Sequence, residues 1–158
     1  MTKTQDRKKT IGDLVRTIER LQSVTDGLSE DQLRVRPEEK KWSIKEIVAH
    51  LAAFEPVVVE RLKAMLSNDN PTIESYNTDA WAAQDHIEEG FDENLQKFIT
   101  ARKKTANILK KIKEKDWLRP GHHPDFQGYS IQVQAEKLAA HDANHLKQID
   151  AIKKRFGF

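Results

Sequence analysis

Hydrophobic residues recur every three or four positions along four long stretches of the chain, and polar residues fill the positions between them. This spacing places the hydrophobic residues on one face of an α-helix. The first stretch covers about 7–26 and ends at Gly27, and the second begins at Ile44. The third begins at Phe91, and the fourth covers about 130–155. No alternation with a period of two competes with this pattern, so we expect an all-α protein.

Capping residues mark where two of the helices begin. Ser29 and Ser43 each precede a Gln or Glu by three residues, the spacing at which the two side chains cap a helix N-terminus reciprocally. The first pair predicts a short helix after residue 29, and the second predicts that a long helix starts at Ile44. Pro56 lies inside the hydrophobic pattern of that helix. Because the pattern continues beyond it, we expect Pro56 to kink the helix rather than end it.

Two long connections separate the predicted helices. Ser67–Gly90 shows no sustained pattern apart from a short helix expected around Asp79–Asp85. Asp116–Tyr129 contains two prolines and two glycines and is expected to be a loop. Four long helices predict a four-helix bundle, and such long connections favour a topology other than simple up-down-up-down. Without an internal repeat or a linker, residues 1–158 are expected to form one domain.

The composition narrows the classes of function. The 27 Lys and Arg residues exceed the 25 Asp and Glu residues by two, a smaller surplus than nucleic-acid binding usually requires. No hydrophobic run approaches the length of a membrane span, and the charged N-terminus shows no secretory signal, so we expect a cytoplasmic protein with neither nucleic acid nor membrane as a partner. The chain has no cysteine, which excludes thiolate nucleophiles and cysteine-based metal sites. Any metal must therefore be bound through nitrogen and oxygen.

Three of the six histidines form a candidate metal site. His141 and His145 are four residues apart, so both imidazoles lie on one helix face and can reach one ion. His145 falls within the hydrophobic stripe of the fourth helix, and His141 lies at its margin. His50 flanks the stripe of the second long helix in the same way. A lone histidine is more often a partly buried, hydrogen-bonded side chain, but three that face one core favour a metal site.

The segments that carry these histidines resemble those of a known family. WSIKEIVAHL at 42–51, followed about ninety residues later by HDANHLKQI at 141–149, is similar to the DinB-like metalloprotein superfamily. The resemblance covers essentially the whole chain and implies an up-down-down-up four-helix bundle with a three-histidine metal site. On that pattern the metal ligands are His50, His141 and His145. Family members of known activity are thiol S-transferases or thiol-dependent isomerases that use bacillithiol, mycothiol or glutathione.

The three imidazole ligands indicate which reactions such a metal site could support. Three neutral imidazoles leave a divalent ion with its full charge and at least one open position, where it lowers the pKa of a bound water or thiol. We therefore expect a metal-dependent transferase or hydrolase that acts on a small molecule, with a low-molecular-weight thiol as cosubstrate. Zinc or nickel is expected, and iron or manganese also tolerates such ligands. The alternatives are a non-catalytic stress-response protein with a structural metal, and a helical dimerisation module with an incidental histidine cluster.

Two further residues could support the metal ligands. Glu46, one turn before His50, could accept a hydrogen bond from a ligand or act as a general base, although its capping role already explains it. Gln148, three residues after His145, could orient that imidazole or lie on an exposed flank.

Other polar residues leave alternatives open. Arg102 and Asp142 fall within hydrophobic arcs of their helices, so they could form an internal ion pair, or Arg102 could bind a substrate carboxylate or phosphate. Turning both charges outward to solvent is the interpretation that we favour. His122 and His123 lie in the loop Asp116–Tyr129 and are expected to face solvent.

The two connections also carry aromatic residues that could act together. They could line a small-molecule pocket beside the metal or seal a dimer interface, and a homodimer is expected. These residues are Tyr76, Trp81, Trp117 and Phe126.

Overall fold

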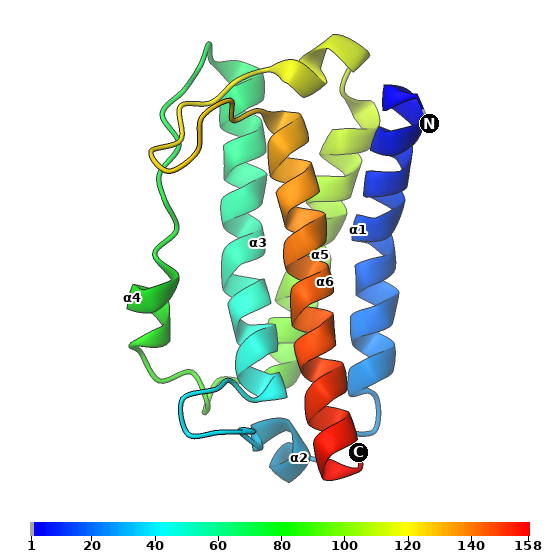
Figure 1. Ribbon diagram of the computed structural model, residues 1–158, viewed down its shortest axis with the longest axis vertical. Coiled ribbons are helices and arrows are strands. Elements are labelled where there is room, and N and C mark those ends of the chain that lie inside the picture. The colour runs from blue at the N-terminus through cyan, green and yellow to red at the C-terminus, as the bar shows by residue number, and fades with distance from the viewer. Residues whose placement is uncertain (1) are drawn as a thin grey trace.

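The computed structural model describes residues 2–158 as a bundle of four long helices (Figure 1). The long helices are α1 (Lys3–Thr25), α3 (Ile44–Ser67), α5 (Phe91–Lys111) and α6 (Ile131–Phe156). Three short helices lie in the connections: α2 (Glu30–Arg34), α4 (Thr78–Ala82) and the 3-10 helix η1 (Glu114–Leu118). Within residues 2–158, only isolated β-bridges accompany the helices. The prediction of an all-α four-helix bundle is confirmed. No helix in this part of the chain is both long and apolar enough to cross a membrane.

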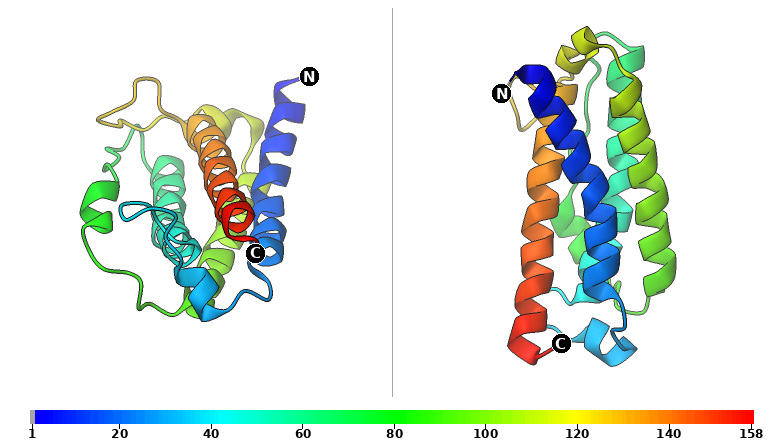
Figure 2. Two further views of the ribbon diagram at one scale, coloured as in Figure 1. Left: turned by 60° about the horizontal axis from the view of Figure 1, so that its bottom comes forward. Right: turned by 90° about the vertical axis from the view of Figure 1, so that its right-hand side faces the viewer.

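The direction of the helices shows the up-down-down-up topology. α1 and α6 run down the bundle in Figure 1, whereas α3 and α5 run up it. Because α3 and α5 are parallel, the chain between them must return along the whole bundle. It does so on the outside, as a segment that carries α4 (Figures 1 and 2).

Side-chain caps set the beginnings of the helices. The Ser43 hydroxyl accepts a hydrogen bond from the backbone N–H of Glu46, whose carboxylate accepts from the N–H of Ser43, so α3 begins at Ile44 as expected. The same reciprocal cap precedes α1 and α2. Pro56 lies inside α3, which continues to Ser67. At the other end of the chain, α6 ends at Phe156 and is capped by Gly157, whose φ of 71° is the left-handed conformation that glycine adopts without strain.

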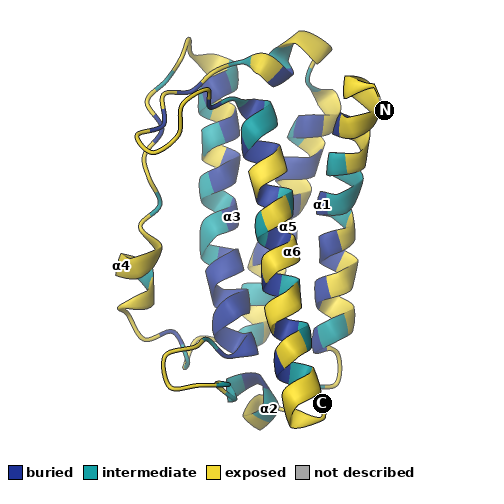
Figure 3. Ribbon diagram, in the orientation of Figure 1, coloured by how far each residue is buried: buried dark blue, intermediate teal, exposed yellow. Residues whose placement is uncertain are grey.

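The buried residues of the long helices face the interior of the bundle (Figure 3) and form two layers along it. One layer lies towards α2 and includes Leu21, Ile47 and Phe98. The other lies towards η1 and includes Leu62 and Leu109.

A charged cluster is also buried in the bundle. Arg102 on α5 is 0% exposed and donates five hydrogen bonds. Two go to the Glu55 carboxylate on α3, both at 2.8 Å, two go to the Asp142 carboxylate on α6, at 2.6 and 2.9 Å, and one goes to the carbonyl oxygen of Leu14 on α1. The expectation that Arg102 and Asp142 turn outward is therefore wrong, because carboxylates on facing helices pair with the guanidinium inside the bundle.

Hydroxyl groups complete this buried network. Thr105 donates to Glu55 at 2.9 Å, and Thr17 donates to Asp142 at 2.8 Å. Since all five N–H groups of Arg102 are occupied, none is left for a substrate, and Arg102 is not a substrate-binding residue in this structure. The network instead joins all four long helices.

Replacing Arg102 should therefore destabilise the fold strongly. We expect Arg102→Met to lower the free energy of unfolding by about 3–5 kcal/mol, because it leaves two carboxylates buried without a cation. The matched control is Arg20→Met, which breaks an exposed ion pair with Asp150 and should cost no more than about 1 kcal/mol. Urea unfolding of both variants measures the difference, and equal losses would contradict the prediction.

Candidate metal centre

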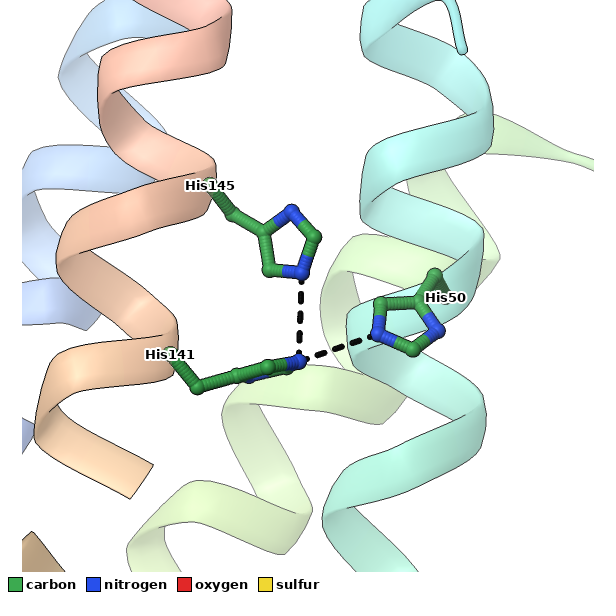
Figure 4. Close-up of side chains that lie close together, drawn as sticks. All are labelled: His50, His141 and His145. Carbon is green, nitrogen blue, oxygen red and sulfur yellow. Dashed lines mark hydrogen bonds between the residues drawn. The ribbon is translucent and has the colours of Figure 1, made fainter. Parts of the chain in front are cut away.

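The three histidines expected to bind metal lie together between two adjacent helices. His50 is near the start of α3, and His141 and His145 are one turn apart on α6 (Figure 4). The Nε2 atom of His141 lies 3.1 Å from Nε2 of His50 and 3.1 Å from Nε2 of His145. His50 is 2% exposed and His145 is 8% exposed. The structure thus brings three imidazole edges to one buried point.

Burial keeps these imidazoles neutral. It lowers the pKa of His50 to about 3, with a further contribution from the neighbouring His145 and His141. It also lowers the pKa of His141 to about 4, and it lowers the pKa of His145. A neutral imidazole offers a lone pair to a metal, whereas a protonated one offers none.

Gln148 determines which nitrogen of His145 offers its lone pair. Oε1 of Gln148 lies 2.8 Å from Nδ1 of His145. Because the amide oxygen only accepts, Nδ1 carries the proton and Nε2 is left bare towards the other histidines. Gln148 therefore orients a ligand imidazole, although the residue itself lies on an exposed flank.

The donor set fits one divalent ion. Two nitrogens bound about 2.1 Å from a zinc ion at a tetrahedral angle lie about 3.4 Å apart, close to the two 3.1 Å separations seen here. All three ligand atoms lie within 4.8 Å of one another, and no other histidine or carboxylate among residues 2–158 joins the group. The Nδ1 atoms of His50 and His141 are buried without a hydrogen-bond partner. Nitrogen ligands of this kind suit zinc, nickel and iron.

Aromatic rings surround the histidines. Trp42, just before α3, lies 5.0 Å from the ring of His50 and 6.2 Å from that of His145. Trp81 of α4 packs edge-on against His50 at 5.3 Å. Phe54 and Tyr76 continue this wall, as the Phe54 ring lies 5.1 Å from His141 and 5.2 Å from Tyr76. The connection 68–90 thus covers the site, and its Tyr76 and Trp81 lie beside the histidines, which is one of the two positions considered for them. Trp42 and Phe54 were not among the aromatic residues expected beside the metal, because they lie just before and within α3 rather than in the two connections.

His86 holds Trp81 over the site. The two rings stack 3.8 Å apart, and the ring nitrogens of His86 lie 2.6 Å from the Glu89 carboxylate and 2.8 Å from the carbonyl oxygen of Trp81. Burial lowers the pKa of His86, but these two acceptors raise it more, so its pKa lies above the ordinary value. These contacts hold Trp81 in place through residues of the same connection, and none of them involves a metal ligand.

Glu46 is occupied by other partners. Its carboxylate accepts hydrogen bonds from Arg36 at 2.8 and 3.0 Å and from the backbone of Ser43 at 3.1 Å. Burial raises the pKa of this carboxyl group, but the bonds from Arg36 and Ser43 lower it more, so the net pKa lies below the ordinary value. An ionised, paired carboxylate is a poor general base, so the structure supports the capping role.

The loop 119–130 contributes nothing to the histidine cluster. His122 is exposed as expected, but His123 is 7% exposed, so the expectation that it faces solvent is wrong. Its ring packs against Phe126 and Tyr129 within the loop, which explains the burial. Trp117 belongs to the core, and Phe126 is exposed on the surface.

Comparison with known proteins identifies the family. The model of the DinB superfamily matches residues 13–149. The chain belongs to the DinB superfamily. It is 26% identical to YuaE of Bacillus subtilis, an uncharacterised protein, over 82% of this chain and 88% of that protein. It is also 26% identical to a protein of Oceanobacillus iheyensis named as a candidate metal-dependent hydrolase, over 85% of this chain and 78% of that protein.

A solved structure shares the fold of the whole chain. YfiT from Bacillus subtilis, described as "a probable metal-dependent hydrolase with an unusual four-helix bundle topology", superposes with a TM-score of 0.90. The alignment covers 100% of this chain and 91% of YfiT at 21% identity. The DinB-superfamily fold that the sequence motifs indicated is therefore shown.

Removing any one of the three histidines should abolish tight metal binding. We expect His50→Ala, His141→Ala and His145→Ala each to bind less than a tenth of an ion per chain in dilute metal, because two imidazoles hold a divalent ion far more weakly than three. The matched control is His122→Ala, which should bind about one ion like the unmodified protein. Metal analysis after reconstitution with zinc or nickel measures this, and metal loss in the His122 variant would mean a different ligand set.

The metal-free protein should lose stability in mild acid. The histidine pKa values are lowered in the folded state, so below about pH 6.5 the unfolded chain takes up protons that the folded chain does not. The contribution of the three histidines to the free energy of unfolding is fully present above that pH. It falls by up to about 1.4 kcal/mol per histidine for each pH unit as the pH drops towards their pKa values in the folded protein.

Variants can attribute this loss to the metal centre. His50→Asn removes one titrating group. Between pH 6 and 5 it should therefore reduce the slope of the unfolding free energy against pH by about 1.4 kcal/mol per pH unit, which corresponds to one proton. Gln127→Asn, at an exposed position that carries no titrating group, should leave the slope unchanged. Urea unfolding of the chelator-treated protein at several pH values tests this, and identical slopes in the two variants would count against neutral, buried imidazoles.

Proposed function

We propose that the protein is a metal-dependent enzyme in which His50, His141 and His145 bind a divalent ion that activates a nucleophile for attack on a small molecule. The proposal rests on the number of protein side chains that can bind the ion. Three imidazoles converge, and no fourth protein ligand joins them among residues 2–158. Catalytic sites keep a coordination position open, whereas structural sites close it with protein. The name of the Oceanobacillus relative, a candidate metal-dependent hydrolase, supports a catalytic metal, although it names water rather than a thiol as the nucleophile.

The surroundings of the histidines favour a thiol over water as the nucleophile. A bound divalent ion would lower the pKa of either ligand at its open position. Water attack commonly also needs a carboxylate base, but Glu46 is paired with Arg36, and Glu55 and Asp142 are paired with Arg102. A coordinated thiol needs no such base once it has ionised. Since the chain has no cysteine, the thiol must come from a small cosubstrate.

The aromatic wall gives the site a second property of an enzyme. Trp42, Phe54, Tyr76 and Trp81 surround the imidazoles with apolar surface and keep bulk water away from the three ligand nitrogens. Exclusion of water strengthens electrostatic interactions within the site and protects a reactive nucleophile. A structural metal in a stress-response protein is the competing function, and it would require the fourth protein ligand that this group lacks.

A thiol should therefore bind directly to the metal. We expect the cobalt-loaded protein to develop a sulfur-to-metal charge-transfer band when glutathione, bacillithiol or mycothiol is added. The band should be missing in His145→Ala and present in His122→Ala. Absorption titration measures it. If no thiol or simple anion such as azide changes the spectrum of the cobalt protein, the coordination sphere is closed and the catalytic proposal fails.

A further inference from the structure

Unsatisfied polar atoms gather on one side of the bundle. Among residues 2–158, four buried side-chain nitrogen or oxygen atoms have no hydrogen-bond partner: Nδ1 of His50, Nε of Arg61, the hydroxyl of Tyr76 and Nδ1 of His141. The residues that carry them all lie next to the ring of Phe54. An unsatisfied buried polar atom costs about 1–3 kcal/mol, so such atoms mark places where a ligand completes the structure.

Arg61 is a cation held by neutral groups. Its guanidinium lies 5.7 Å from the centroid of the Phe54 ring. It donates to the amide oxygen of Gln134 at 3.1 Å and to the backbone carbonyl of Glu74 at 2.9 Å. No carboxylate within the described residues 2–158 forms an ion pair with it. Arg61 thus differs from Arg102, whose five N–H groups are all taken.

The charge of Arg61 affects the groups around it. Burial lowers the pKa of His123, and Arg61 lowers it further. Burial raises the pKa of Tyr129, and Arg61 opposes that rise. Both effects are those expected of a positive charge close to these two side chains.

Arg61 and the metal centre lie on the same side of α3. Phe54 and Arg61 follow His50 on α3 by four and eleven residues, a spacing that keeps all three on one side of the helix. On α6, Gln134 precedes His141 by seven residues, again on one side. Tyr76 lies over the same side of α3, because its ring is 6.1 Å from that of His50 and 5.2 Å from that of Phe54.

We propose that Arg61 and Tyr76 bind the carboxylate of the substrate whose other end reaches the three histidines. This inference rests on the proposed function and names the class of molecule: a small monocarboxylic acid with an apolar middle part. Arg61 supplies the cation and its unused N–H groups, Tyr76 supplies a hydroxyl donor, and Phe54 lies under the carbon chain. One guanidinium neutralises one carboxylate and can donate two parallel hydrogen bonds to it.

Thiols of graded length with and without a carboxylate test this proposal. The probes are ω-mercaptoalkanoates and the ω-mercaptoalkanols of matching length, and the readout is the charge-transfer band of the cobalt-loaded protein. We expect one or two chain lengths of the acid to bind about tenfold to a hundredfold more tightly than the matching alcohol, the gain expected of a charge-assisted hydrogen bond. Shorter acids, which cannot reach from the histidines to Arg61, should bind like their alcohols.

Variants show whether Arg61 is the cation responsible. Arg61→Met should remove the preference for the acid while leaving the alcohol affinity and the metal content unchanged. Arg16→Met removes an exposed arginine from α1 and should leave the preference intact. Tyr76→Phe removes a hydroxyl that has no hydrogen-bond partner within residues 2–158, so this variant should fold normally and reduce the preference by about threefold to tenfold.

The outcomes separate this inference from the proposed function. If acids and alcohols bind equally at every length, or if Arg61→Met and Tyr76→Phe both keep the preference, the carboxylate site is wrong even though thiols reach the metal. If neither series changes the spectrum, the open metal position is wrong. Calorimetry then tests the carboxylate site on its own. It measures the binding of alkanoates without a thiol to the unmodified protein and to Arg61→Met. Equal or absent alkanoate binding in both proteins would then overturn it.

Discussion

The geometry of the site depends on one buried guanidinium. Arg102 holds carboxylates of α3 and α6 at the same time, and these carboxylates lie close in sequence to the metal-site histidines: Glu55 follows His50 by five residues, and Asp142 directly follows His141. Hydrophobic layers alone tolerate small sliding of helices, whereas this network is directional and is lost entirely if one helix moves by a turn of about 5.4 Å. We infer that the ion pairs set the relative height of α3 and α6, and with it the convergence of the three imidazoles.

The topology supplies the rest of the site. Parallel α3 and α5 force the connection between them to run back along the bundle, and it passes over the face of α3 that carries His50 and Phe54 (Figure 1). In doing so it brings Tyr76 and Trp81 to the imidazoles and the carbonyl of Glu74 to Arg61. An up-down-up-down bundle would close this link with a short turn and leave the same face uncovered. The long connection is therefore part of the site.

Local sequence patterns were enough to predict the long helices of this fold. The predictions that were wrong depend on contacts between different elements. The cap at Ser43 and the stripe spacing predicted where α3 begins, because both signals lie within one helix. A helical wheel also placed Arg102 and Asp142 inward, but it could not show Glu55 on the facing helix, so the outward orientation was favoured wrongly. Likewise, His123 is buried by other residues of an irregular loop, where no periodicity reports burial. Arg61 was not among the predicted site residues. It is distinguished by the lack of a carboxylate partner, and only the packed structure shows this.

The balance of charge explains why the region between the histidines and Arg61 should bind an anion. Arg102 with its two carboxylates carries a net charge of −1 beside His141, while three neutral imidazoles leave the charge of a bound divalent ion unchanged. That ion and the buried network together would be positive by one charge, and Arg61 adds a second. Within an apolar wall, uncompensated charge is costly, and no carboxylate among residues 2–158 is free beside the imidazoles to offset it. A thiolate on the metal and a substrate carboxylate at Arg61 would neutralise both positive centres, so the electrostatics of the fold and the position of its unsatisfied donors both favour a carboxylic acid as the substrate.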